Sequence, residues 1–261
     1  MLAQRHMTTS DEESPASPDS TPGGVVRRDR DFTETQWGVV KSASGQEGAA
    51  AAKPALDYLC RRYWPPIYAF LRREGYSATD AEDLTQGFFE ELFSTDALSR
   101  ADEAKGRFRN FLLGALQRFL VDQLRHKNAI KRGRGKVVLA GDFAEVERQY
   151  LAEADPALTA EKVFDRRWAA TVLEMAKAEL ATHFTGPGQA KRFAVLQDFL
   201  DKDGSEKAYR KAASKLGTTM EAVAPAVCRL RGRYNECIRR IVLATVSGPE
   251  EVDPEFAGLF G

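Results

Sequence analysis

The chain has 261 residues, which is enough for one large domain or for two smaller ones that each bury a core. Lysine plus arginine and aspartate plus glutamate number 38 each, so no net field draws the whole protein onto a nucleic acid or a membrane. The three cysteines lack CxxC spacing, which favours a reduced cytoplasmic setting over a disulfide framework or a zinc site. No apolar run could span a membrane and no signal-peptide core is present, so a soluble cytoplasmic protein is expected.

Charges of opposite sign are segregated in the first half of the chain. Residues 80–103 carry eight acids and one arginine, whereas residues 105–136 carry ten lysines and arginines and one acid. This division suggests two different partner surfaces next to each other.

Helical periodicity of 3.6 residues dominates after about residue 52 and predicts an all-α protein. Residues 1–31 are rich in Ser, Thr, Pro, Gly and charge, a composition that predicts a disordered arm. A helix is predicted over residues 54–74, with Pro65 and Pro66 interrupting or kinking it.

The next predicted helix carries the acidic segment. Thr79 and Glu82 have the spacing of a capping box, and an apolar stripe of Ala81, Leu84, Phe88 and Leu92 follows. This stripe leaves the acids of the segment facing outward. A loop over residues 94–107 is expected to lead into a third helix.

The third helix, over residues 108–129, separates apolar and polar sides. Its buried stripe is predicted to include Leu112, Leu116 and Phe119, while Gln117 and Arg118 fall on the opposite side. Cations in one sector with aromatic rings nearby suit a groove for phosphates and unstacked bases. A solvated helix face followed by a charged loop is the alternative interpretation.

Weak periodicity and turn residues over 133–160 predict a linker between two domains, at residues 32–132 and 161–244. The segment 245–261 is expected to be an acidic, mobile tail, although Phe256, Leu259 and Phe260 could pin it. These last three side chains are its largest apolar groups.

Residues 209–231, YRKAASKLGTTMEAVAPAVCRLR, have the outline of a helix-turn-helix. Gly217 would lie in the turn, and Thr218 or Thr219 would cap the second helix, which would enter a major groove. Residues 207–240 carry nine cations against two acids, enough to attract a phosphate backbone. The same outline is common in other helical proteins.

Several segments together resemble the bacterial sigma factors of the extracytoplasmic-function (ECF) type. DAEDLTQGFF at residues 80–89 is similar to their polymerase-binding segment, and FLLGALQRFLVDQLR at 111–125 to their promoter-melting helix. YWPPIYAFLRREGYS, KGRFRNFLL and FDRRWA match a subgroup of the family. The matches follow the family's order from about residue 32 to residue 260.

The resemblance implies partners and roles for particular residues. The partners would be core RNA polymerase and promoter DNA, with an anti-sigma factor as a further family expectation, and no membrane, cofactor, metal or small-molecule substrate is expected. The implied polymerase contacts are Asp80, Asp83, Leu84, Gln86 and Phe89. The implied contacts at the minus-10 element are Lys105, Arg107, Phe108, Arg109, Asn110, Phe111, Arg118, Arg125, Lys127 and Arg132, and those at the minus-35 element are Thr218, Thr219, Arg229, Arg231 and Arg233.

The chain departs from the family pattern in three places. Phe111 stands where many members have Trp, and Arg118 stands where many have Asn. Pro225 lies inside the predicted recognition helix, where it removes a backbone donor and should bend the helix, so weak or shape-based reading of the minus-35 element is expected.

Other functions remain open on the residues alone. A regulator that binds duplex DNA without polymerase and a helical scaffold for acidic proteins are the alternatives. An enzyme is not expected, because the three histidines are isolated and no Gly-rich phosphate loop precedes a helix. Asp80 and Asp83 share a helix face, but a solvated acidic surface is favoured over a metal site.

Overall fold

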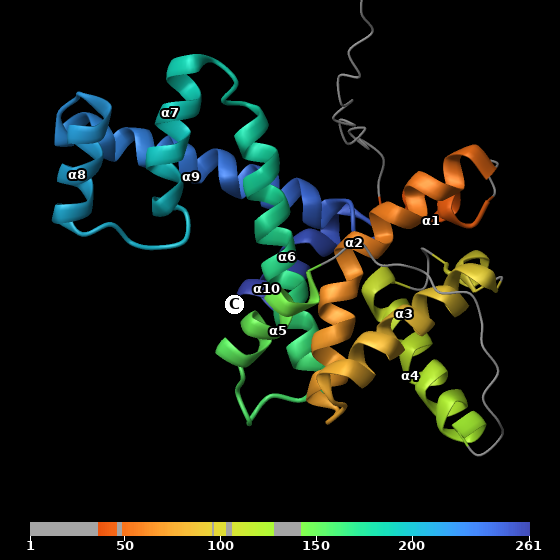
Figure 1. Ribbon diagram of the computed structural model, residues 1–261. Helices are drawn as coiled ribbons and strands as arrows, with labels where there is room; N and C mark the ends of the chain where they lie inside the picture. The colour runs from red at the N-terminus through yellow and green to blue at the C-terminus, as the bar shows by residue number, and fades with distance from the viewer. Residues whose placement is uncertain (1–35, 46–48, 96, 103–105, 128–141) are drawn as a thin grey trace, which may run out of the picture. The chain divides into compact units, whose positions relative to one another are not determined.

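The computed structural model describes residues 36–45, 49–95, 97–102, 106–127 and 142–261, and these are helical with no strand among them (Figure 1). The prediction of an all-α protein is therefore confirmed for this part of the chain, whereas the predicted arm at 1–31 lies outside it. The elements are α1 Gln36–Ala43, α2 Ala49–Arg73, α3 Ala78–Ser94, η1 Leu98–Arg100, α4 Phe108–Lys127, α5 Phe143–Ala152, α6 Ala160–Thr182, α7 Pro187–Leu196, η3 Gln197–Phe199, α8 Glu206–Leu216, α9 Met220–Leu243, η4 Pro249–Glu251 and α10 Val252–Phe260.

Helix α2 is central to the fold, because α1, α3, α5 and α6 all contact it. It runs through Pro65 and Pro66 as one helical element, so of the two expected effects the interruption does not occur, and the kink stays a prediction. Its buried side carries Leu59, Tyr63 and Ile67, which repeat at helical spacing. Burial of this side against four other helices outweighs the hydrogen bonds that the prolines remove.

An aromatic cluster joins helices that lie far apart in the sequence. The ring of Tyr63 on α2 stacks on Trp168 of α6, with centroids 4.5 Å apart and planes 10° apart. Phe108 of α4 meets Tyr63 edge-on at 5.4 Å and Trp37 of α1 at 5.7 Å. All four rings are at most 1% exposed, so the cluster forms part of the core.

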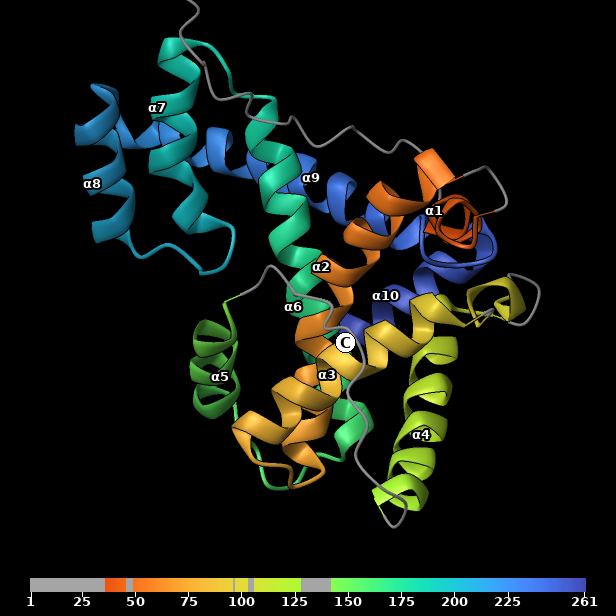
Figure 2. The same cartoon turned by 45° about the vertical axis from the view of Figure 1, so that its right-hand side comes forward.

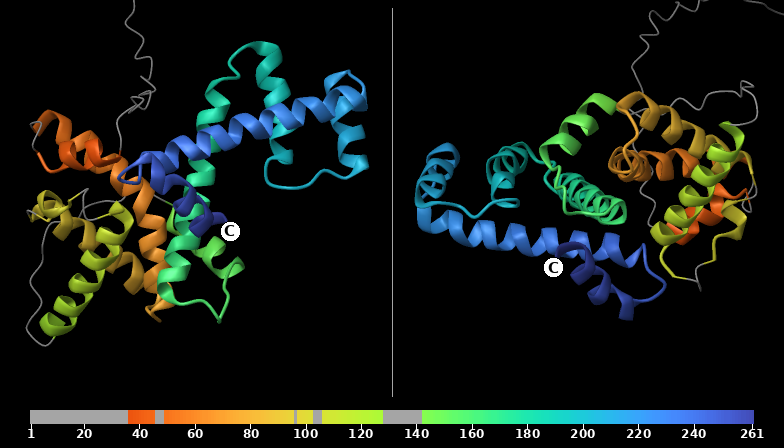
Figure 3. Two further views of the ribbon diagram at one scale, coloured as in Figure 1. Left: turned by 180° about the vertical axis from the view of Figure 1, so that it is seen from behind. Right: turned by 90° about the horizontal axis from the view of Figure 1, so that it is seen from below.

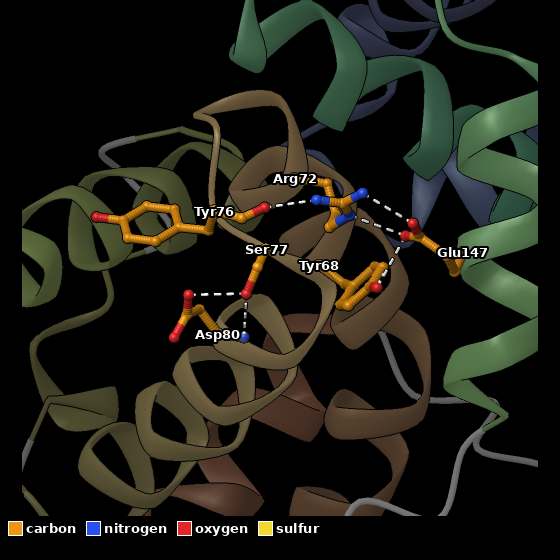
Figure 4. A network of polar contacts seen from close by, with 6 residues as sticks. All are labelled: Tyr68, Arg72, Tyr76, Ser77, Asp80 and Glu147. Carbon is orange, nitrogen blue, oxygen red and sulfur yellow. Dashed lines mark hydrogen bonds and ion pairs between the residues drawn. The ribbon is translucent and has the colours of Figure 1, made fainter.

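Helix α5 lies within the segment that was predicted to be a linker. The ring of Phe143 packs on Trp64 and Tyr68 of α2, and Arg72 binds the Glu147 carboxylate with two hydrogen bonds of 2.8 and 2.9 Å (Figure 4). The Arg72 hydrogen bonds hold the pKa of the Glu147 carboxyl below its usual value. Residues 143–152 of the predicted linker are therefore a docked helix.

The helices on the two sides of the predicted linker also pack directly against each other. By their contacts, residues Phe32–Gly261 group into one compact unit, and α6 lies against α2 over much of its length (Figure 1). Arg73 at the end of α2 reaches the start of this second part, where its Nε donates to Leu158 O at 2.6 Å. A division into two independent domains stays a prediction.

The start of α3 differs from the predicted capping box. Ser77 is the N-cap, and its hydroxyl accepts a hydrogen bond from the Asp80 backbone N–H at 3.1 Å (Figure 4). Thr79 instead lies within the first turn. Ser77 takes the cap because its extended backbone, at φ −62° and ψ 162°, points its side chain at the free amides of the first turn.

Helices α6 to α9 form the second half of the molecule. Tyr234 Oη of α9 donates to Leu173 O of α6 at 3.0 Å, and Arg240 pairs with Glu179. Helix α8 ends at Gly217, whose positive φ of 62° is the left-handed conformation that favours glycine. Helix α9 then runs through Pro225 as one element.

The last segment is helical and docked. Helix α10 contacts α9 and α6, and Figure 3 shows it lying along the far end of α9. Val252 is 8% exposed, and Phe256, Leu259 and Phe260 pack on the core. These three side chains therefore pin the segment that was expected to be a mobile tail. In the described part of the chain, no helix is long and apolar enough to cross a membrane.

Candidate nucleic-acid interface

The acidic side of α3 is exposed at its first two turns. Asp80 and Asp83 are exposed, and Leu84 and Gln86 are half-buried. Phe89, which was expected to contact polymerase, is 1% exposed and packs in the core against Phe88 and Phe93. Because Phe89 falls on the apolar side of α3, it has no surface to offer a partner in this conformation.

A groove of about 480 Å³ lies between α3, α4 and the η1 segment. Figure 2 shows α3 and α4 from the side on which both are visible. Phe88 of α3 and Phe111 and Phe119 of α4 supply aromatic surface to the groove. Its volume lies within the range of small-ligand pockets, which is about 300–1,000 Å³.

Charged side chains of both signs line the same groove. Arg118 comes from α4 and Arg100 from η1, while Glu91 and Asp122 supply carboxylates. Guanidinium groups donate hydrogen bonds and carboxylates accept them, so such a set can match the mixed edge of a nucleobase while the rings stack on its face. The groove can hold a flat, polar-edged ring.

The start of α4 differs from the predicted base pocket. Phe108 lies in the aromatic core, and Arg109 is 7% exposed. Arg109 pairs with Asp165 of α6 and, at 2.9 Å, with Glu255 of α10. Phe108 and Arg109 are therefore not available to DNA in this conformation, because tertiary contacts cover both.

Arg107 belongs to the same ionic group. One of its nitrogens lies 2.8 Å from the Glu255 carboxylate, and its side chain is 27% exposed, against 0% for Glu255. We call Arg107, Arg109, Asp165 and Glu255 the α10 ionic cluster. It joins the start of α4 to two helices from the second half of the chain.

The remaining predicted residues of α4 are spread along its exposed side. Asn110, Arg118 and Arg125 are exposed, and Arg125 makes a solvent-exposed pair with Asp122 at 3.4 Å. Lys127 ends α4 with a side chain that is not described, and Lys105 and Arg132 lie outside the described residues. Of the aromatic candidates, only Phe111 lines the groove while remaining half-buried.

The predicted minus-35 residues separate into two groups. Thr218, Thr219, Arg229 and Arg233 are exposed. Arg231, in contrast, is directed back into the protein, where its Nε donates to Phe199 O at 2.9 Å and its second nitrogen to Lys202 O at 2.9 Å. Arg231 points to the opposite side of α9 from Arg229 and Arg233. Its hydrogen bonds hold the segment before α8 in place.

Arg229 and Arg233 line a smaller pocket of about 220 Å³. Arg192 and His183 border it from α7 and from the end of α6, over a floor that includes Leu196 and Leu230. This clustering of three arginines was not expected from the sequence, because it brings α6, α7 and α9 together.

The sequence reasoning also missed the acids that complete the α10 ionic cluster. Glu255 lies three residues after Val252, on the buried side of a short helix. An acid at an apolar position of an otherwise amphipathic tail was the only local signal.

Comparisons of this chain with protein-family models, with curated proteins and with solved structures find no match.

Proposed function

We propose that this chain is a sigma factor of the ECF type that binds core RNA polymerase, directs it to promoters and initiates strand opening. The observation that carries the proposal is that α3, whose first turns expose Asp80 and Asp83, and α4, which carries Arg118, lie on the two sides of one groove lined by phenylalanine rings. An acidic helix suits a basic protein surface, and the groove suits an unstacked base.

The parts of this interface have different roles in the proposal. Asp80 and Asp83 contact the polymerase, because they are exposed on α3 and belong to a different charge block from the cations assigned to DNA. Phe111 stacks on a base of the non-template strand, and Arg118 binds its edge or the adjoining phosphate. Extruding a base costs a few kcal/mol, which these contacts must offset.

The helices α8 and α9 act in the proposal as a helix-turn-helix on duplex DNA. Gly217 makes the tight turn between them, and Arg229 and Arg233 reach phosphates from the exposed side of α9. Ala222 and Pro225 on the same exposed side offer no hydrogen bonds to base edges. We therefore expect duplex binding that depends on phosphate contacts and DNA shape.

Co-elution with core polymerase separates this function from its alternatives. The purified chain is mixed with core polymerase, passed over a sizing column at moderate salt and assayed for run-off transcription. Co-elution with promoter-dependent transcripts supports the proposal. Duplex binding without co-elution would instead identify a regulator that acts alone, and the loss of both activities would leave a scaffold.

Charge reversal tests the proposed polymerase surface. Asp83→Lys should weaken polymerase binding by about tenfold, or about 1.4 kcal/mol, because it places a like charge against a basic partner. Asp198→Lys is the matched control, since Asp198 is an exposed acid on η3. Equal losses in the two variants would contradict the assignment of α3.

A second pair of variants tests the groove. Arg118→Ala should leave co-elution unchanged and impair promoter opening, measured by permanganate reactivity of unpaired thymines. Arg148→Ala is its control, because Arg148 is exposed on α5, does not line the groove and is not assigned to DNA. Opening that is unaffected by Arg118→Ala would refute the role of the groove.

A further inference from the structure

Helix α10 carries a carboxylate on its buried side. Val252 and Glu255, one turn apart, are the buried residues of this helix. Its exposed acid Asp253 pairs with Arg239 of α9 at 2.8 Å, and Arg239 also lies over the ring of Phe256. The helix is therefore held by this surface ion pair and by the packing of its apolar side chains, whereas Glu255 points at the start of α4.

Two arginines converge on one oxygen of this carboxylate. Glu255 Oε2 lies 2.8 Å from an Arg107 nitrogen and 2.9 Å from an Arg109 nitrogen. Two guanidinium groups around one oxyanion also form a favourable arrangement for a phosphate oxygen, because arginine forks match phosphate geometry. The site therefore has the chemistry of a phosphate site with a carboxylate in it.

The α10 ionic cluster uses only part of its hydrogen-bonding capacity. Glu255 Oε1 and Arg109 Nε are buried and make no hydrogen bond within the described part of the chain. A buried ion pair with unsatisfied atoms gains little net stability, because the desolvation of the charges offsets their attraction. The Glu255 carboxylate is thus suited to replacement by another anion at Arg107 and Arg109.

The receiving side of the site also has contacts that do not involve α10. Asp165 of α6 binds Arg109 from a position that is 27% exposed, so Arg109 keeps one partner if Glu255 leaves. Arg107 O accepts hydrogen bonds from the Asn110 and Phe111 amides at 3.0 and 3.3 Å, which sets Arg107 directly before the first turn of α4. Phe111, one turn later, lines the groove between α3 and α4.

We propose that Arg107 and Arg109 form a binding site for a nucleic-acid backbone phosphate, and that Glu255 of α10 occupies this site in the free chain. This inference rests on the proposed function. Displacement of α10 opens the start of α4, so that a strand whose base lies in the groove gains a phosphate contact beside it. A nine-residue helix at a chain end can open locally at a free energy below that of global unfolding.

Removal of the Glu255 charge tests whether this carboxylate occupies the phosphate site. The probe is a fluorescent single-stranded 20-nucleotide DNA, titrated with the full chain and followed by anisotropy. Glu255→Gln should bind it about tenfold more tightly at low salt, and its log–log salt slope should steepen by about 0.7, the value for one added phosphate contact on a single strand. Arg107→Ala in the Glu255→Gln background should abolish the gain.

Two controls separate this effect from general charge. Asp253→Asn removes one acid from the exposed side of the same helix and should change affinity less than twofold. Glu255→Asp keeps the charge and should keep the weak binding of the parent chain. Equal tightening by Asp253→Asn and Glu255→Gln, or no tightening by Glu255→Gln, would overturn the proposal.

A measurement on the unaltered chain guards against a variant that does not fold. Hydrogen exchange with and without the oligonucleotide should show faster exchange over residues 252–260 and slower exchange near Asn110 and Phe111 in the complex. DNA binding with unchanged protection of α10 overturns the inference. Failure to co-elute with polymerase, together with a gain in Glu255→Gln, would refute the sigma function and leave the phosphate site standing.

Discussion

Replacement of Trp168 by alanine should destabilise both halves of the described structure together. Trp168 is 1% exposed, and its ring stacks on Tyr63 of α2, which in turn contacts Phe108 of α4. Deletion of a buried tryptophan side chain costs about 3–5 kcal/mol. For 150–250 residues, each kcal/mol corresponds to about 2–4 °C in Tm, so we expect a decrease of about 6–20 °C.

Thermal unfolding followed by far-UV and near-UV circular dichroism measures this change. The two signals should fall in one transition in the parent chain and in Trp168→Ala, because α2 and α6 share the aromatic cluster. Leu151→Ala is the control: Leu151 is 59% exposed, so its truncation should change stability by less than about 0.5 kcal/mol. Two separate transitions, with only one shifted by Trp168→Ala, would refute cooperative packing of α2 on α6.

Two further predictions concern titratable groups. Glu147→Gln should lower the free energy of unfolding by about 1 kcal/mol near neutral pH, since the Arg72 hydrogen bonds lower the native pKa of Glu147. This stabilisation is present above the unfolded pKa of about 4.3 and is lost as the pH falls through the native pKa. Urea denaturation measures the difference between the two chains, and the same difference at neutral pH and near pH 2 would contradict the prediction. At about pH 8, a thiol reagent should modify exposed Cys228 rapidly and spare buried Cys60, because burial and the nearby Asp57 raise the pKa of the Cys60 thiol to about 12. An absorbance assay counts the thiols that react, and two rapidly reacting thiols per chain would be the contrary result.

Local sequence patterns were sufficient for the helices that bury one face against a core. The stripe of Ala81, Phe88 and Leu92 identified the inward side of α3, and Asp80 and Asp83 are exposed as that stripe requires. The turn at Gly217 was likewise predicted from residue type, and its backbone there is left-handed. These features depend on residues within a few turns of one another.

Predictions that depended on distant partners were less successful. Pro65 and Pro66 have an unfavourable local effect on a helix, yet α2 continues through them because four helices cover it. Weak periodicity over 133–160 suggested a linker, although Phe143 and Glu147 anchor α5 on α2. Neither anchoring contact is visible in the local pattern.

The sequence by itself determined the helical class, the amphipathic sides of α3 and α4, and the adjacent blocks of opposite charge. Only the tertiary structure decided that Arg109 is buried, because its partner Glu255 lies 146 positions away. Periodicity reports which side of a helix is apolar, but the availability of a cation depends on which helix packs over it. The groove between α3 and α4 stays open, whereas the start of α4 is covered by α10.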